Sequence, residues 1–434
     1  MGIIYNEKAK TFTLHTQNTT YQMQIDAYGF LLHLYYGRKT DGVMDYLLTY
    51  ADRGFSGNPQ DTGNDRTYSL DVLPQEFPCR LTGDFRSPVL DLVNADGSLG
   101  CDLRYQGYEI CDGKYNLKGL PAVYAAEEEA QTLIIYMKDQ VTGLQVELLY
   151  GVLPEYDVIT RSAKVINTEE DKIRLTKAQA ACIDFLHGEF DVISFYGRHA
   201  MERNMQRTSV GHGAFVIGSR RGTSSHQYNP MMILAEKETT EDAGTCYGMS
   251  FVYSGGFKAE VEKDQFGQTR MQMGLQEEQF SYPLKKGEEF VIPEVILTCS
   301  NQGLEKLSQN LQRCIRKNLC RGKYKEKVRP VLINSWEACY FDFTGEDIYH
   351  LAEQAKDLGI DMVVLDDGWF GERNGIENGL GDWYVNEEKF PNGIDELIKE
   401  VKSLGLLFGI WVEPEMVNPP TKLYAEHPDW IYHF

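Results

Sequence analysis

Several features of common protein classes are absent from this sequence of 434 residues. No apolar run approaches the roughly 20 residues that a membrane-spanning helix needs, and the first residues, MGIIYNEKAK, lack the apolar stretch of a secretory signal. The nine cysteines are odd in number and never have C-x-x-C spacing, so neither a disulfide framework nor a zinc site is expected. These absences predict a cytoplasmic protein with reduced thiols and no membrane partner.

Positive charge is also scarce. Lys and Arg number 43 against 64 for Asp and Glu, which gives a formal net charge of -21. Such an acidic surface repels phosphate backbones, so nucleic acid is not an expected partner. The sequence has no Gly-rich phosphate loop, no G-x-S-x-G motif and no metal-ligand spacing among its histidines. We therefore expect no cofactor, no metal and no serine hydrolase chemistry.

Residues 1 to about 300 read as β structure. Apolar and polar side chains alternate with the period of a half-buried strand, and short turns separate the segments. The clearest segments are 133–137, 144–152, 157–166 and 289–298. So many antiparallel strands predict a large two-sheet β-sandwich. The stretches around 51–100 and 196–232 lack the pattern and are expected to be loops.

A helical segment and a basic stretch follow the β region. Apolar side chains recur at three- and four-residue spacing over 304–319, and RGKYKEKVR (321–329) ends at Pro330. We predict three parts of the chain. These are a β domain at 1–300, a linking helix and basic linker at 301–327, and an α/β domain at 328–434.

The last part alternates strands with helices. Short apolar strands are predicted within 331–336, 361–370 and 406–414. The predicted N-cap pairs of the two intervening helices are Thr344 with Asp347 and Asn392 with Asp395. Gly359 and Gly405 are predicted to end these helices. Two copies of one βα unit indicate a parallel sheet or barrel.

Polar and aromatic residues follow each predicted parallel strand. Trp336 follows the first strand, Asp366 and Asp367 follow the second, and Trp411 follows the third. In a βα barrel such strand ends line the active site. Because Trp faces pack on the C–H faces of sugars and carboxylates accept hydrogen bonds from hydroxyls, the pattern predicts a site for a neutral polyol.

These residues also allow other interpretations. Two adjacent Asp residues can simply cap a turn, although the buried-strand pattern VVL before Asp366 favours a functional role. Asp366 and Asp367, with Glu413 and Glu415, could instead bind a divalent metal with phosphate, but no phosphate loop supports that. Trp383 and Trp430 are interpreted as packing residues.

Eight stretches together carry a resemblance to a known family. They are DRGFSGNP (52–59), YSLDVLPQEFP (68–78), DFRSP (84–88), RGTSSHQYNP (221–230), NSWEACYFDF (334–343), VVLDDGWFGERN (363–374), LGDWYVNEEKFPNG (380–393) and GIWVEPEMVNP (409–419). In order and spacing they resemble the N-terminal two-thirds or so of the bacterial α-galactosidases of glycoside hydrolase family 36. The resemblance implies a β-supersandwich followed by a (β/α)8 TIM barrel.

The resemblance also implies an activity and roles for particular residues. The activity is retaining hydrolysis of terminal α-1,6-linked galactose from melibiose, raffinose and stachyose. By position, Trp336 and Trp411 resemble walls of the galactose pocket, while Asp366 and Asp367 resemble the pair that binds the sugar hydroxyls. Relatives form homotetramers in which a loop reaches the neighbour's active site, and Phe55 and Arg66 are the corresponding candidates here.

The catalytic carboxylates of the family have no counterpart in the sequence. A (β/α)8 barrel takes about 250 residues, whereas only three of its strands are predicted from Val328 on. The KWD motif that holds the nucleophile of relatives does not occur. We therefore expect the nucleophile and acid/base beyond Phe434, and an inactive fragment. The alternatives are an α-N-acetylgalactosaminidase or galactosyl transferase of the same family, or a non-catalytic carbohydrate-binding module.

Overall fold

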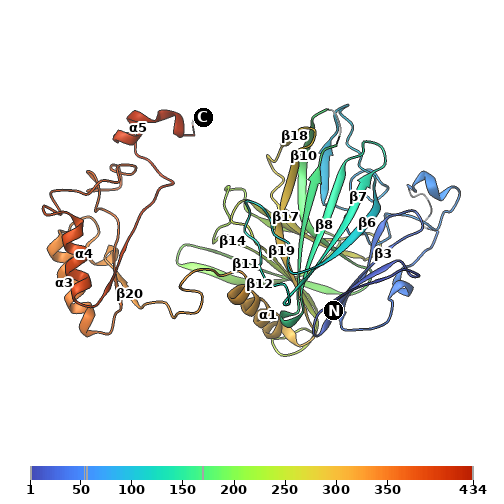
Figure 1. Ribbon diagram of the computed structural model, residues 1–434, viewed down its shortest axis with the longest axis horizontal. Helices are drawn as coiled ribbons and strands as arrows, with labels where there is room; N and C mark the ends of the chain where they lie inside the picture. Colours follow the sequence, from blue (N-terminus) through green and yellow to red (C-terminus); the bar gives the residue numbers. More distant parts are fainter. Residues whose placement is uncertain (1, 53, 55–56, 169–170, 433–434) are drawn as a thin grey trace. The chain divides into compact units, whose positions relative to one another are not determined.

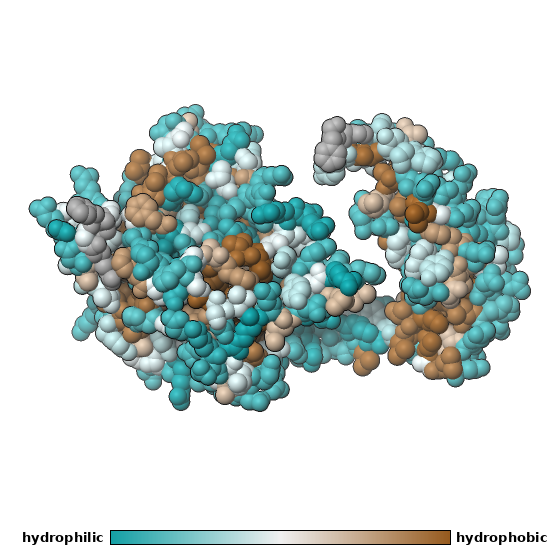
Figure 2. Space-filling model, turned by 180° about the vertical axis from the view of Figure 1, so that it is seen from behind, coloured by the Kyte–Doolittle hydropathy of each residue, from teal (hydrophilic) through white to brown (hydrophobic). Residues whose placement is uncertain are grey.

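The computed structural model describes residues 2–52, 54, 57–168 and 171–432. The chain divides into two compact units, Met1–Cys320 (unit 1) and Arg321–Phe434 (unit 2). Most of the surface in the view of Figure 2 is hydrophilic, with apolar side chains gathered in patches. Among the described residues, no helix is long and apolar enough to cross a membrane. All nine cysteines lie in the described part of the chain and carry free thiols.

Unit 1 is built from antiparallel sheets (Figure 1). The chain begins with a four-stranded sheet, and the largest sheet has nine strands. The four-stranded sheet has the order β1 (Ile3–Asn6), β2 (Thr11–His15), β3 (Thr19–Ile25), β4 (Leu31–Arg38). The nine-stranded sheet has the order β12 (Met201–Ser209), β11 (Phe190–Arg198), β14 (Tyr228–Glu236), β15 (Cys246–Phe251), β19 (Glu289–Ser300), β9 (Val158–Ile166), β8 (Gln145–Leu153), β7 (Gln131–Asp139), β6 (Leu103–Asp112). The four segments with the clearest alternation are therefore confirmed as strands.

A six-stranded sheet completes unit 1. Its path is β13 (Gly213–Gly218), β16 (Phe257–Lys263), β17 (Thr269–Leu275), β10 (Ile173–Phe185), β18 (Tyr282–Leu284), and β5 (Leu90–Val93) also pairs with β10. Short 3-10 turns occupy Asp45–Leu47, Gln60–Thr62 and Pro154–Tyr156. One apolar cluster joins the three sheets, because it combines side chains such as Phe12, Leu148 and Met271, which are fully or almost fully buried. Burial of this shared face is the main source of stability for the unit.

Helix α1 (Gly303–Asn318) belongs to unit 1 and packs on its nine-stranded sheet. Its buried side chains Leu307, Leu311 and Cys314 meet the outer face of the nine-stranded sheet at residues such as Ile193 and Ile296. The spacing of three and four residues places them on one side of the helix. The predicted helix over 304–319 is confirmed.

The expectation of loops over 196–232 is wrong. This stretch contains β12 and β13 and the start of β14. Strand β12 is an edge strand whose side chains are all exposed or half-exposed. A strand without a buried face has no reason to alternate apolar and polar residues, so its sequence carried no periodic signal.

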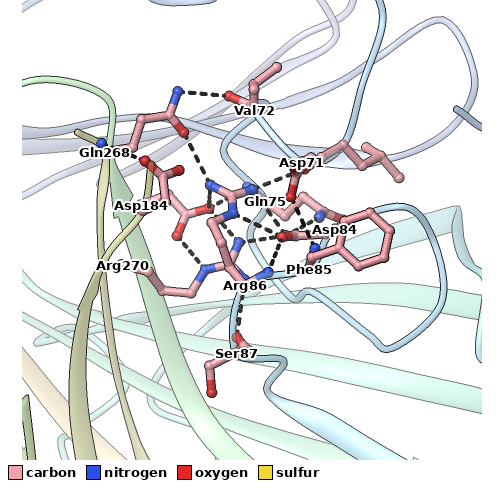
Figure 3. Close-up of polar contacts among 12 residues, drawn as sticks. Asp71, Val72, Gln75, Asp84, Phe85, Arg86, Ser87, Asp184, Gln268 and Arg270 are labelled. Carbon is pink, nitrogen blue, oxygen red and sulfur yellow. Dashed lines mark hydrogen bonds and ion pairs between the residues drawn. The ribbon is translucent and has the colours of Figure 1, made fainter. Parts of the chain in front are cut away.

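A cluster of buried charges fixes the irregular segment 68–88 to the six-stranded sheet (Figure 3). Arg270 Nε and Nη2 lie 2.7 and 2.8 Å from oxygens of Asp184 and Asp84, and Arg86 Nε lies 2.8 Å from Asp84. All four side chains are at most 4% exposed. Buried charges are tolerated only when they are paired and hydrogen-bonded, and here each charge has such partners.

Unit 2 contains a small parallel sheet with helices. The strands have the order β20 (Leu332–Asn334), β21 (Met362–Leu365), β22 (Leu407–Ile410). The helices are α2 (Trp336–Cys339), α3 (Gly345–Asp357), α4 (Ile394–Ser403) and α5 (Lys422–Glu426), with a 3-10 turn at Pro428–Trp430. Helices α3 and α4 lie side by side (Figure 1) and bury Ile348, Ala352, Leu397 and Val401 in one core. The predicted strand–helix alternation and parallel pairing are confirmed.

The helix ends agree with the predictions in three of four places. Thr344 and Asp347 form a capping box at the start of α3, and Gly359 (φ 77°) and Gly405 (φ 86°) follow the ends of α3 and α4 in the left-handed conformation. The predicted cap Asn392 is wrong. Gly393, with φ 81°, is the N-cap of α4 and offers no side chain.

Candidate functional site

The carboxyl ends of the three parallel strands meet at one edge of the sheet. Asn334 of β20 pairs with Val364 of β21, and Leu365 of β21 pairs with Ile410 of β22. The chain continues in register beyond the strands, because the Trp411 amide donates to the Leu365 carbonyl at 2.9 Å. All four predicted sugar-site residues leave the sheet at this edge, which we call the strand mouth.

Asp366 is held by the end of the neighbouring strand. Its Oδ2 accepts a hydrogen bond of 2.6 Å from Asn334 Nδ2, and its own amide donates to Ser335 Oγ at 3.0 Å. Its Oδ1 accepts from the Asp367 amide at 2.7 Å. The side chain therefore both closes a local turn and bridges β20 to β21.

Asp367 is paired with an arginine that the sequence interpretation did not single out. Arg373 Nη2 lies 2.8 Å from Asp367 Oδ2, and Arg373 Nε lies 3.0 Å from Asp367 Oδ1. The side chains are 5% and 8% exposed. The only signal was the place of Arg373 inside the stretch VVLDDGWFGERN, six residues after its partner.

The surroundings of Arg373 fix its position. Its Nη1 donates to the Asn378 carbonyl at 2.8 Å, and its guanidinium lies 5.2 Å from the centre of the Phe341 ring. Gly379 adopts φ 84°, and a Cβ there would lie 2.8 Å from the Arg373 side chain. The loop thus packs closely on the backbone and Cβ of Arg373, and the guanidinium holds the Asp367 carboxylate through its hydrogen bonds.

Both predicted wall tryptophans are half-buried. The Trp336 ring packs edge-on against Phe341 at 5.0 Å, and its amide donates to Asn334 Oδ1 at 2.8 Å. The Trp411 carbonyl accepts from Trp369 Nε1 at 2.8 Å. Both residues thus keep part of their surface accessible, which the predicted role as stacking walls requires.

The other tryptophans have packing roles. Trp369 is buried, and the centre of the Trp383 ring lies 4.2 Å from that of Phe370. These contacts agree with the interpretation of Trp383 as a packing residue. Trp430 is 66% exposed and stacks on His427, so its packing stays at the surface.

Two further charged residues belong to the strand mouth. Lys389 Nζ donates to the carbonyls of Phe341 and Gly368 at 2.7 and 2.9 Å, and burial lowers its pKa. Burial raises the pKa of Glu413, and the charges of Glu415 and Asp367 raise it further. The mouth therefore combines fixed donors, fixed acceptors and one carboxyl group whose pKa is raised.

The predicted neighbour-reaching residues belong to unit 1. Arg66 is exposed and pairs with Asp52, with 3.2 Å between Arg66 Nε and Asp52 Oδ2. Phe55 lies outside the described residues. Among the residues that the structure describes, no group of three or more His, Cys, Asp or Glu side chains is arranged to hold a metal ion.

The comparisons with known proteins identify the class of this mainly β unit followed by βα repeats as glycoside hydrolases. The family model described as "Glycosyl hydrolase family 36 N-terminal domain" matches residues 29–285, and the model described as "Melibiase" matches residues 289–434. The chain belongs to glycosyl hydrolase family 36.

Individual relatives match almost the whole length of the chain. It is 61% identical to the bifunctional alpha-galactosidase/sucrose kinase AgaSK of Mediterraneibacter gnavus, over 99% of this chain and 46% of that protein. It is 45% identical to alpha-galactosidase AgaA of Geobacillus stearothermophilus, over 100% of this chain and 59% of that protein. The chain thus spans about half of the length of these curated relatives.

Solved structures give the same result. The galactosidase domain of AgaSK superposes with a TM-score of 0.97, over 99% of this chain and 60% of that one. Variants of AgaA solved in complex with raffinose and with stachyose are 44% identical and superpose with a TM-score of 0.95. Each covers 98% of this chain and 59% of the solved chain.

Proposed function

We propose that the protein to which this chain belongs is a retaining α-galactosidase that hydrolyses terminal α-1,6-linked galactose from oligosaccharides of the melibiose, raffinose and stachyose type. The observation that carries the proposal is the combination of half-buried Trp rings and fixed carboxylates at the strand mouth. The names of the relatives and the raffinose and stachyose complexes of AgaA support it.

In this proposal the strand mouth binds the galactose unit. Trp336 and Trp411 form walls against the C–H faces of the sugar, while Asp366 and Asp367 accept hydrogen bonds from its hydroxyls. An ionised carboxylate has about four lone-pair sites. Arg373 makes three hydrogen bonds to Asp367, so about one acceptor site remains there for a hydroxyl group.

We do not assign Asp366 or Asp367 to nucleophilic attack or proton transfer. Retaining glycosidases use two carboxyl groups about 5–5.5 Å apart that flank the glycosidic bond. Asp366 and Asp367 are adjacent in the chain, and each is already fixed by a partner on one side. This arrangement suits substrate binding, and we propose that no catalytic carboxylate lies within residues 1–434.

The finer architecture is part of the same proposal. Residues 1–300 would form a β-supersandwich, 301–327 a linking segment, and 328–434 the first three βα units of a (β/α)8 barrel. The βαβαβ order of β20, α3, β21, α4 and β22 supports the last assignment. The protein would be cytoplasmic, and the resemblance alone supports a homotetramer in which Phe55 and Arg66 reach a neighbouring site.

Calorimetry and an activity assay on the 434-residue chain test this proposal. We expect galactose to bind, Asp367→Asn to weaken binding about tenfold or more, and nitrophenyl α-galactoside to remain uncleaved. Equal galactose affinity of the variant and the unaltered chain would contradict the assignment of the mouth. Sustained turnover by the chain would contradict the placement of the catalytic carboxylates.

A further inference from the structure

A second groove lies wholly in unit 1. It has a volume of about 990 Å³ and is formed by β13, the segment 219–228, the start of β16 and residues 276–278. Small-molecule sites are typically concave spaces of about 300–1,000 Å³. Part of its wall comes from RGTSSHQYNP (221–230), a stretch that carries the family resemblance and belongs to unit 1.

The groove offers one aromatic surface among polar side chains. Tyr228, at the start of β14, is 41% exposed and lines the groove together with Gln227 and Gln276. Ser225 Oγ donates to Gln227 Oε1, and the Glu278 amide donates to Gln276 Oε1 at 3.2 Å. These bonds fix both amide planes near an exposed ring, an arrangement that suits a ligand with apolar faces and hydroxyl edges.

Four of the five charged side chains that line the groove form two ion pairs, and Arg221 adds one further positive charge. Arg220 forms an ion pair with Glu278, and Lys258 Nζ lies 2.6 Å from Glu277 Oε1. An anion would have to displace Glu278 from Arg220, and a cation would meet Arg221 at the same wall. The groove therefore favours a neutral ligand that uses paired Arg and Glu groups as hydrogen-bonding partners.

The floor of the groove is preorganised. Gly218 packs so closely on the neighbouring strand that a Cβ there would lie 2.5 Å from the Phe257 carbonyl oxygen. A Cβ on Gly256 would lie 3.1 Å from the Ser219 carbonyl oxygen. Such close backbone contacts leave the floor little room to move, which lowers the entropic cost of binding.

We propose that this groove is a non-catalytic binding site for a neutral oligosaccharide of the α-galactoside class, with Tyr228 as its stacking surface. The inference rests on the proposed function for the choice of sugar class. It places a second carbohydrate contact on unit 1, which would hold an oligosaccharide chain independently of the strand mouth.

The test is calorimetric titration of raffinose into the 434-residue chain carrying Asp367→Asn, so that binding at the strand mouth is weakened about tenfold or more and the effect of Tyr228 can be read separately. In that background we expect residual raffinose binding, which Tyr228→Ala weakens at least tenfold and Tyr228→Phe weakens less than threefold. Gln227→Ala, a milder change, is expected to weaken it about threefold. The matched control is Tyr282→Ala, because Tyr282 is also 41% exposed but does not line the groove.

The outcomes separate this inference from the proposed function. Loss of raffinose binding with Asp367→Asn alone, at an unchanged unfolding midpoint of unit 1, would overturn the second site and leave the strand mouth supported. Equal raffinose affinity of the Tyr228→Ala and Tyr282→Ala variants would also overturn it. Residual binding that depends on Tyr228 would support the groove even if galactose binding at the mouth were refuted.

Discussion

Both units bury Asp–Arg pairs, but the two arrangements differ in what surrounds them. In unit 1, Asp84 and Asp184 lie between Arg86 and Arg270, and the Gln75 amide donates to Asp184 at 3.0 Å (Figure 3). In unit 2, Asp367 has one arginine partner and leaves the sheet beside half-exposed aromatic rings. The first network is internally complete, whereas the proposed role of the second requires acceptor capacity for a ligand.

A buried Asp–Arg pair can therefore stabilise the fold or, in the proposed function, orient a carboxylate for binding. A buried pair contributes little net stability relative to apolar residues, but removing one partner is costly. The network of unit 1 fixes a long irregular segment that contains no strand and pairs with β4 and β5 through single bridges at Gln75 and Cys79. At the strand mouth, by contrast, the arginine sets the direction in which a carboxylate presents its free lone pairs.

The largest expected effect comes from breaking the network of unit 1. Asp184→Ala leaves two buried guanidinium groups with one carboxylate, so we expect unit 1 to lose about 3–5 kcal/mol of unfolding free energy. Because all five Trp residues lie in unit 2, far-UV circular dichroism of the β structure and Trp fluorescence report on the two units separately. The Trp transition should stay within about 1 kcal/mol of its original position, because the network consists of residues of unit 1 alone.

Asp52→Ala is the matched control for this variant. Asp52 also pairs with an arginine in unit 1, but its side chain is 51% exposed. An exposed pair contributes about 0–1 kcal/mol. If Asp184→Ala cost no more than Asp52→Ala, the network would not stabilise the irregular segment.

Acid should act on the same network. Burial alone would raise the pKa of Asp184, but Arg270 and then Arg86 lower it to about 2. A carboxyl group with a depressed pKa contributes stability above its unfolded pKa of about 3.9, and that stability is lost as the pH falls through its folded pKa. We expect Asp184 to contribute about 2 kcal/mol at neutral pH, and this to disappear between about pH 4 and pH 2.

Unfolding of unit 1 by urea, measured at several pH values, checks this expectation. The Asp184→Ala variant should show a weaker decline below pH 4 than the unaltered chain. Parallel curves for the two proteins would mean that other carboxyl groups, such as Glu76, account for the acid sensitivity.

At the strand mouth, Arg373→Lys tests orientation without removing the charge. A lysine ammonium cannot form the two-pronged contact that a guanidinium makes with a carboxylate. We expect galactose affinity to fall about tenfold, which corresponds to about 1.4 kcal/mol, while β-sheet circular dichroism is unchanged. Lys402→Arg on the exposed side of α4 is the control, and an affinity equal to that of the control would exclude a positioning role for Arg373.

Much of the fold could be predicted because one face of most strands is buried. In strands β7, β8, β9 and β19, side chains at alternate positions belong to the shared apolar cluster, and these strands coincide with the predicted segments. Strand β12 escaped prediction because both of its faces meet solvent. The cap of α4 escaped for a different reason, since a glycine with positive φ replaces the side-chain cap that the sequence suggested.

The candidate site was predictable only where the strand register determines it. Trp336, Asp366, Asp367 and Trp411 each follow a parallel strand, so their common edge follows from the βα pattern. Arg373 reaches Asp367 through a loop with positive φ at Gly368 and Gly371. Periodicity does not encode such a loop path, which is why the arginine partner was missed.

The smallest expected effect concerns Glu413. Burial raises its pKa, and the charges of Glu415 and Asp367 add to this increase. A carboxyl group whose folded pKa lies above its unfolded pKa opposes folding when it is ionised, so unit 2 should gain stability as the pH falls through the raised pKa. Glu413→Gln removes this charge and should slightly raise the Trp-detected unfolding midpoint at pH 7. The difference from the unaltered chain should vanish at a pH low enough to protonate Glu413, and a midpoint lowered by the substitution would show instead that the ionised carboxylate stabilises the mouth.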